Sequence, residues 1–269
     1  MLKYSMFFFI KNIPKPVEYR VEYDYSKDIC NEYSYRYMYT PISKKNKCFS
    51  PYIRKKKKVN GNRYGSTKLP HDTQKNWGIF GKNLVLTIDD SYDFKQTKRM
   101  FELLERYGIT ATFFPNTIYI NSRNPEHIQL WREIYNSGHE IGYHTTDHTR
   151  KRTVEELEKD FSTFTKKFRK ILDDNNFSIK SVRAPYGYFD KIWLEWVAKN
   201  NLFNVRWTIT ENEDKNYLRK LYKEGKGTVL LLHNKESDVE WLTNHIDKFL
   251  QISKENGGKI GSIYDSIIK

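Results

Sequence analysis

Two aspartates and two histidines of this chain have types and spacing that could bind a metal ion. Asp89 and Asp90 are adjacent, and His144 and His148 are four residues apart. On a helical turn, imidazoles four apart share one side. A carboxylate with two imidazoles leaves a coordination position open to water, as catalytic zinc sites do. Each pair alone also fits capping or packing, but together they predict a metal-dependent hydrolytic site.

These residues follow apolar, strand-like runs, and so do an arginine and a third histidine. In a barrel of parallel strands, the carboxyl ends of the strands gather at one rim. Residues far apart in the sequence would therefore converge on one pocket. The runs, each with the residue that follows it, are 84–88 (Asp89), 140–143 (His144), 181–182 (Arg183) and 228–232 (His233).

The two aspartates are predicted to have different roles. If Asp90 binds the cation, strand alternation points Asp89 away and leaves it free to accept a proton from the attacking water. A bound metal can lower the pKa of water to about 7, so an ordinary carboxylate suffices as the base. Arg183 would keep Asp89 ionised and oriented, unless it forms an ion pair elsewhere on the rim.

The remaining chemistry is assigned to the other two strand ends. Pro185 lacks an amide hydrogen, so the amide of Tyr186 becomes the donor toward a developing oxyanion. His233 would protonate the departing group, although a histidine at the end of an apolar strand also fits a packed core position.

Strands and helices alternate from residue 81 onward, which predicts a parallel sheet or barrel. The longest helix begins at Thr153, which has capping-box spacing to Glu156, and its apolar stripe is assigned to the core. That stripe is Val154, Leu157, Phe161, Phe164, Phe168 and Ile171. Further strands are expected at 110–114, 204–210 and 259–264, and further helices at 100–107, 125–136, 189–200, 217–224 and 239–254.

Residues 1–80 differ from the rest and are predicted to be a separate N-terminal Tyr/Lys-rich extension. They carry 17 Lys or Arg against 6 Asp or Glu, whereas residues 81–269 carry 30 against 27. Alternating tyrosines in 17–25 and 33–39 indicate a β-hairpin that packs or stacks on sugars. The basic run 54–58 favours an exposed linker, with polyanion binding as the alternative.

The sequence leaves the compartment open. Cys30 and Cys48 are too few to indicate redox conditions. The apolar segment 4–10 is short for an export signal and lacks a small-residue cleavage site, so it is interpreted as a strand or packing segment. No stretch approaches the roughly 20 apolar residues of a membrane span.

From about residue 82 to the end, the chain resembles polysaccharide deacetylases of the NodB-homology type, carbohydrate esterase family 4. The motifs occur in the family's order and are jointly specific. They are Thr87-Ile88-Asp89-Asp90-Ser91, Ala111-Thr112-Phe113-Phe114, Gly138-His139-Glu140-Ile141-Gly142 leading into His144 to His148, Arg183-Ala184-Pro185-Tyr186-Gly187, and Leu231-Leu232-His233.

The resemblance implies a distorted (β/α) barrel that removes acetyl groups from N-acetylated or O-acetylated sugars with a divalent metal, commonly Zn²⁺. It also implies action on cell-wall or envelope glycans. The implied roles are Asp89 as base, Arg183 as its partner, His233 as acid, Tyr186 as main-chain oxyanion donor, Asp90, His144 and His148 as metal ligands, Leu231 lining the acetyl pocket, and Trp207 in the substrate groove.

Two positions depart from the family pattern. Ser91 replaces the glycine that usually follows the aspartate pair, and it could tighten the turn or add a hydroxyl near the base. The usual Asp-x-x-Asp-Trp cluster is not recognisable near Trp207. Glu213 or Asp214 is therefore expected to supply the missing acidic group.

The sequence thus predicts a metal-dependent deacetylase for an amino-sugar polymer such as peptidoglycan or chitin fragments. One alternative is an O-acetyl glycan (xylan-type) esterase. Another is a catalytically weak glycan-binding protein that uses its basic front as an adhesive. Specific nucleic-acid binding is not expected, because no recognition motif accompanies the basic run.

Overall fold

A computed structural model describes residues 77–211 and 227–267 of the 269-residue chain. Residues 1–76 of the predicted extension, with its hairpin, the basic run and both cysteines, lie outside these ranges, as do Glu213, Asp214 and the helix expected at 217–224. Those predictions remain untested. In the ranges described, no helix combines the length and hydropathy needed to cross a bilayer.

The core of the fold is a parallel sheet centred on the long buried strand β1, Leu84–Asp90. The apolar runs predicted as strands form it because both faces are covered, which suits continuous apolar sequence. The strand order is β3-β2-β1-β7-β6, and β8 also pairs with the start of β1. The other strands are β2 (Thr112–Pro115), β3 (Glu140–Ile141), β6 (Ile209–Thr210), β7 (Thr228–His233) and β8 (Ile260–Gly261).

A second pair of strands completes a distorted barrel. β4 (Ser181–Val182) pairs in parallel with β5 (Phe203–Asn204), and a bridge from Tyr143 to Val182 continues the series from the β3 edge. Residues 205–208 then join β5 to β6 at the other end of the series. The predicted fold class is therefore confirmed.

The single strand predicted at 204–210 was wrong, because its two halves have different neighbours. The amide of Val205 donates to the carbonyl of Val182, whereas the amide of Thr208 donates to that of Val229. The chain changes partners between them, so β5 and β6 belong to separate sheets. This break is where the barrel departs from a regular ring.

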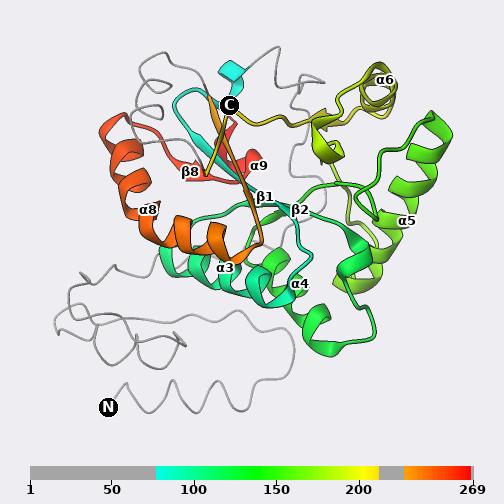
Figure 1. The fold of residues 1–269 in the computed structure, drawn as a ribbon, viewed down its shortest axis with the longest axis horizontal. Helices are drawn as coiled ribbons and strands as arrows, with labels where there is room; N and C mark the ends of the chain where they lie inside the picture. The colour runs from blue at the N-terminus through cyan, green and yellow to red at the C-terminus, as the bar shows by residue number, and fades with distance from the viewer. Residues whose placement is uncertain (1–76, 212–226, 268–269) are drawn as a thin grey trace. The chain divides into compact units, whose positions relative to one another are not determined.

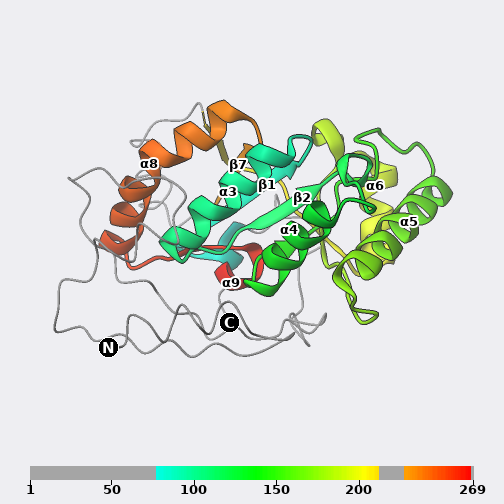
Figure 2. The ribbon, with the colours of Figure 1, turned by 90° about the horizontal axis from the view of Figure 1, so that it is seen from below.

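In the part of the chain that the structure describes, five longer helices cover the outside of the strands in the order α8, α3, α4, α5, α6, each in contact with the next. Figure 1 shows α3 and α4 between α8 on one side and α5 on the other, and Figure 2 shows α3 and α4 side by side over β1 and β2. The bounds are α3 (Phe94–Tyr107), α4 (Pro125–Asn136), α5 (Val154–Leu172), α6 (Lys191–Lys199) and α8 (Glu236–Glu255). Short helices are η2 (Trp77–Phe80), η3 (Thr117–Tyr119), η4 (Pro185–Gly187) and α9 (Ile263–Ser266).

Three of these helix ends have the local signals that were predicted for them, whereas α3 and α8 begin earlier than expected. Gly108 ends α3 in the left-handed region at φ 62°, and Pro125 opens α4. The Thr153 hydroxyl accepts the amide of Glu156 at 3.1 Å and so caps α5. In the α5 stripe, Leu157, Phe164, Phe168 and Ile171 are buried, and Val154 and Phe161 are partly buried against the same core.

The last predicted strand, 259–264, is only partly present. β8 ends at Gly261, and Ser262 begins α9 by accepting the amide of Asp265 with its side chain. Ser262 is a preferred N-cap residue, and its capping bond competes with continued strand pairing.

Candidate active site

Three predicted ligands meet at the carboxyl-terminal rim of the barrel. Asp90 Oδ1 lies 3.4 Å from Nε2 of His144 and 3.4 Å from Nε2 of His148. One ligand atom from each residue lies within 4.8 Å of the others. Asp90 Oδ1 is buried and has no hydrogen-bond partner among the described residues. A buried carboxylate oxygen that faces two imidazoles is costly unless a cation or proton satisfies it, so the set fits a divalent metal.

The electrostatics favour the protonation states that a metal needs. Burial alone would raise the pKa of Asp90, but the neighbouring imidazole of His144, with the charges of His148 and His233, holds that pKa below its usual value. Burial lowers the pKa of His148, against the opposing charge of Asp90. An ionised carboxylate and a neutral imidazole are the forms that bind a divalent cation.

The orientation of His144 is fixed from behind. Its Nδ1 lies 2.7 Å from the carbonyl oxygen of Arg183, which can only accept, so Nδ1 carries the hydrogen. The lone pair is then on Nε2, the nitrogen that faces Asp90. Metal-binding histidines commonly have such a second partner, which sets both tautomer and ring orientation.

The histidine pair lies on an irregular loop, so the premise of a helical turn was wrong. Thr145 and His148 have left-handed φ values of 64° and 58°. Asn116 Nδ2 donates to the His144 carbonyl at 2.7 Å, and the Asp160 carboxylate accepts the amide of Thr146 at 2.9 Å. These bonds hold a backbone shape that propensity alone would not select.

The predicted partner of Asp89 is in place. Arg183 Nη1 donates to Asp89 Oδ1 at 2.6 Å and to Thr87 Oγ1 at 2.9 Å, and both ionic groups are buried. The guanidinium also lies over the rings of Phe114 and Trp207, at 4.6 and 5.7 Å from their centroids. A charge-assisted hydrogen bond between two buried groups orients the carboxylate tightly.

Asp89 does not point away from the ligands, contrary to the alternation argument. Its Oδ2 lies 3.6 Å from His144 Nε2, close to the 3.4 Å distance from the same nitrogen to Asp90. The reason is local: Asp90 has φ 73° and Ser91 has φ 61°, so regular alternation ends there. Both carboxylates therefore face the same nitrogen of His144.

His233 is oriented by a residue that the sequence analysis did not select. The buried carboxylate of Asp238, in the first turn of α8, accepts the His233 amide at 2.7 Å and lies 3.6 Å from its Nδ1. Asp238 raises the pKa of His233, burial opposes this, and the charges of Asp89 and Asp90 add to the rise. The imidazole therefore keeps its proton to higher pH than usual.

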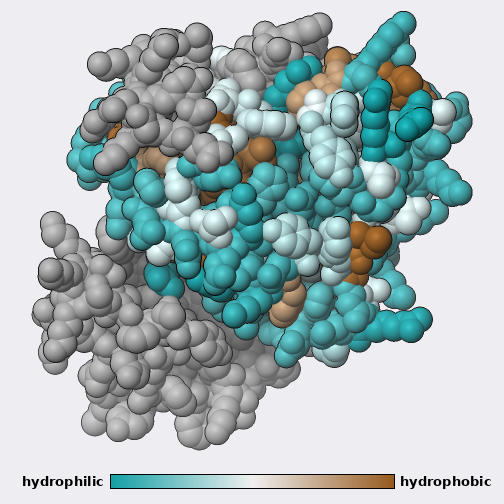
Figure 3. Space-filling view, viewed as in Figure 1, coloured by the Kyte–Doolittle hydropathy of each residue, from teal (hydrophilic) through white to brown (hydrophobic). Residues whose placement is uncertain are grey.

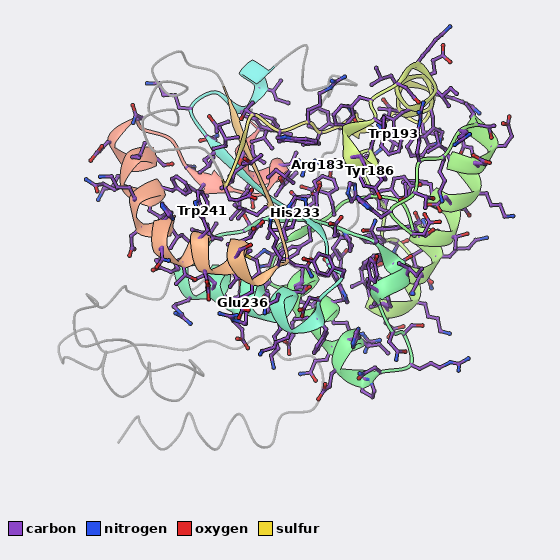
Figure 4. All side chains as sticks on the ribbon, in the orientation of Figure 1. Arg183, Tyr186, Trp193, His233, Glu236 and Trp241 are labelled. Carbon is purple, nitrogen blue, oxygen red and sulfur yellow. The ribbon has the colours of Figure 1, made fainter. Side chains whose placement is uncertain are left out.

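The remaining predicted residues lie around this centre. Arg183, Tyr186 and His233 lie in the central part of the view in Figure 4. The backbone hydrogen bonds that close η4 are donated by the amides of Gly187 and Tyr188. Tyr186 has φ 55°, and its ring centroid lies 4.3 Å from that of His148. Leu231 is two residues before His233 on β7, so the two side chains share a face of the strand.

Trp207 supports the site from beneath Arg183. Besides its contact with the guanidinium, its ring is close enough to Gly187 that a Cβ there would approach it to 2.9 Å. Gly187 also has φ 69°, so both backbone conformation and space require a glycine in this turn. The contact observed for Trp207 is thus structural, and its predicted place in the substrate groove remains a prediction.

Comparison with known proteins places this geometry in a family. The polysaccharide deacetylase family model matches residues 80–205. The chain contains a polysaccharide deacetylase domain. It is of the NodB-homology type, carbohydrate esterase family 4, as the motifs indicated.

Relatives of the deacetylase domain include enzymes and a pseudoenzyme. A peptidoglycan-N-acetylglucosamine deacetylase from Bacillus cereus is 30% identical over 128 residues, 47% of this chain and 44% of that protein, so less than half of its length is matched. A family 4 carbohydrate esterase from Bacillus anthracis has a TM-score of 0.55 at 25% identity, covering 70% and 83% of the two chains. A family 4 pseudoenzyme from the same organism has the same fold, with a TM-score of 0.54 at 20% identity over 69% and 65%.

Three positioning residues of the deacetylase domain were missed from the sequence. Asp160 lies on the apolar stripe of α5. Its buried carboxylate accepts hydrogen bonds from Tyr143 Oη at 2.7 Å and from the amide of Thr146 at 2.9 Å. A charged residue on an apolar helix face is a signal that could have been used. Asn116, after β2, and Asp238, in an acidic first turn, offered weaker signals.

Proposed function

We propose that this deacetylase domain is a zinc-dependent hydrolase that removes acetyl groups from N-acetylated amino sugars of a glycan. The observation that carries the proposal is the convergence of the Asp90–His144–His148 cluster with the Asp89–Arg183 ion pair on one rim. Next to them stands His233, a histidine with a raised pKa. A structural metal site would not need a buried, oriented carboxylate beside it.

Each residue has a defined task in this proposal. A bound zinc ion would supply the Lewis acidity that makes water nucleophilic near neutral pH. Asp89 accepts the proton of the attacking water, and Arg183 keeps its carboxylate ionised and aimed. The amide of Tyr186 donates to the oxygen that gains negative charge as the acetyl carbon becomes tetrahedral.

His233 completes the reaction by donating its proton to the departing nitrogen as the carbon–nitrogen bond breaks. An amine leaves poorly as an anion, so an amide needs a proton donor more than an ester does. The raised pKa of His233 keeps that donor protonated to higher pH. Leu231 is proposed to border the acetyl methyl, because it shares the strand face of His233 and is nearly buried. The relatives include peptidoglycan and chitooligosaccharide deacetylases, which agrees with an N-acetylated substrate.

Acetate release tests the proposal directly. The zinc-loaded full chain is incubated with N-acetylglucosamine oligomers and, separately, with acetylated xylan, before and after complete removal of divalent metal. We expect release from the oligomers that stops on metal removal and returns with zinc. Release from xylan alone would favour the O-acetyl esterase, and binding without release would favour the catalytically weak glycan-binding protein.

A further inference from the structure

The exposed large hydrophobic side chains of the described residues all lie in loops that follow the carboxyl ends of strands. They are Tyr92 (46% exposed) after β1, Ile118 (63%) and Tyr119 (45%) after β2, and Tyr186 (69%) and Tyr188 (51%) after β4. The face in Figure 3 is mostly hydrophilic, with pale and brown atoms in a few places. Exposed apolar side chains confined to one region of a surface mark a binding site.

Tyr92 and Tyr119 form a pair although they come from different loops. Their ring centroids are 6.3 Å apart and their planes cross at 74°, an edge-to-face contact. This arrangement is one that aromatic pairs prefer. Each ring therefore helps to fix the other before any ligand arrives, which reduces the entropy cost of binding.

The loop that carries Tyr119 is tied to the loop that carries the metal ligands. The amide of Asn116 donates to the carbonyl of Asp90 at 2.7 Å, and the amide of Ile118 donates to that of Thr146 at 2.8 Å. Lys167 Nζ, on α5, also donates to the carbonyl of Thr117 at 2.6 Å. The tyrosine pair thus has a fixed place relative to Asp90 and the histidine loop.

A second aromatic pair lies on the other side of the histidine loop in strand order. Tyr186 and Tyr188 have ring centroids 6.2 Å apart, and the Arg150 guanidinium lies 5.0 Å from the ring centroid of Tyr188. The loop of His144 and His148 lies between the two tyrosine pairs in the order of strands. That order is β1, β2 and β3, and the bridge from Tyr143 continues it to β4. Ligand contacts on both sides of the reacting centre suit a chain rather than a single sugar.

We propose that Tyr92 and Tyr119 form a sugar-binding platform for the glycan chain. The platform binds a sugar of that chain other than the unit being deacetylated. The inference rests on the proposed function for the chemistry at the centre, and it assigns binding of the neighbouring part of the glycan to two named side chains. Tyrosine suits this task because its ring presents an apolar face to sugar C–H groups while its hydroxyl remains in water. The platform requires no charge on the ligand.

Chain-length dependence tests the platform. Initial rates are measured for the dimer and hexamer of N-acetylglucosamine with wild type, Tyr92→Ala/Tyr119→Ala and Tyr92→Phe/Tyr119→Phe. We expect the alanine variant to lower the hexamer-to-dimer ratio of kcat/KM by roughly 10-fold, mainly through KM for the hexamer. The phenylalanine variant keeps the rings and should keep the ratio. An unchanged ratio in the alanine variant would overturn the platform.

Calorimetric binding separates this proposal from the proposed function. If wild type releases no acetate from either oligomer, the proposed function fails, but hexamer binding still tests the platform. Binding that is lost in the alanine variant and kept in the phenylalanine variant supports it. Equal binding by all three proteins, or no binding by wild type, overturns it.

Discussion

Asp89 and His233 occupy paired positions on neighbouring strands, since the parallel register of β1 and β7 sets them opposite each other. In the proposed reaction one takes a proton and the other gives one, so the central strands of the barrel fix the spacing of base and acid. Arg183, directly after β4, holds Asp89, and Asp238, on α8, holds His233. The proposed base and the proposed acid are therefore oriented by different residues.

Replacing the base should separate metal binding from turnover. In Asp89→Asn we expect zinc content to be unchanged, because Asp90, His144 and His148 remain. Turnover should fall roughly 10²- to 10⁴-fold, the usual contribution of a general base. The free energy of unfolding should fall by about 3 kcal/mol, because Arg183 stays buried without its ionic partner.

Asp173→Asn is the matched control for that substitution. Asp173 is an exposed residue that ends α5 at φ 54°, a conformation that asparagine also tolerates. Metal content, acetate release and urea unfolding are measured for both variants. Wild-type turnover in Asp89→Asn would remove Asp89 as the base.

Removing a predicted metal ligand should instead weaken zinc binding. His148→Ala should lose more than about 100-fold in zinc affinity, because even residues that only support a ligand contribute 10- to 100-fold. His245→Ala is the control, since His245 stacks on Trp241 on α8 away from the cluster. Calorimetric titration with zinc measures both, and equal affinities would show that His148 is not a ligand.

Ser91 should be strained, since it lies buried at φ 61° with a hydroxyl that lacks a partner among the described residues. Glycine adopts that conformation freely, so Ser91→Gly should raise the free energy of unfolding by about 1 kcal/mol in urea titrations. Asn201→Gly, at φ 55° in an exposed turn, should change it little because asparagine tolerates the same region. A less stable Ser91→Gly protein would mean that the hydroxyl has a bonding role.

The alkaline limit of activity should depend on Asp238. His233 must be protonated to act as the acid, so activity falls as pH rises through its pKa. Asp238 is the main cause that raises this pKa, against the effect of burial. Asp238→Asn should therefore shift the alkaline limb of the kcat/KM profile to lower pH. An unshifted limb, with kcat/KM near wild type below it, would show that Asp238 does not tune His233.

The sequence predicted what local signals determine. The apolar runs that became β1 and β7, the Gly108 stop and the Thr153 cap each depend on neighbours in the chain, so their structures match the prediction. The three predicted metal ligands, Arg183 and His233 each lie at or near the end of a strand-like run. Parallel strands place these ends at one rim, so the sequence could predict that the residues meet.

What the sequence could not supply depends on partners distant in the chain. The split of 204–210 follows from two different hydrogen-bonding neighbours. The approach of both Asp89 and Asp90 to His144 follows from a left-handed residue at the strand end. Asp238 was missed because α8 begins at Glu236, three residues before the expected start. The extra turn places that carboxylate under His233.

The most direct test of the account is the position of zinc in crystals of the full chain, located by anomalous diffraction at the zinc edge. The account predicts one strong peak at about 2.0–2.2 Å from Asp90 Oδ1 and from Nε2 of His144 and His148. A protein that releases acetate while its zinc lies elsewhere, or while this cluster binds none, would contradict it.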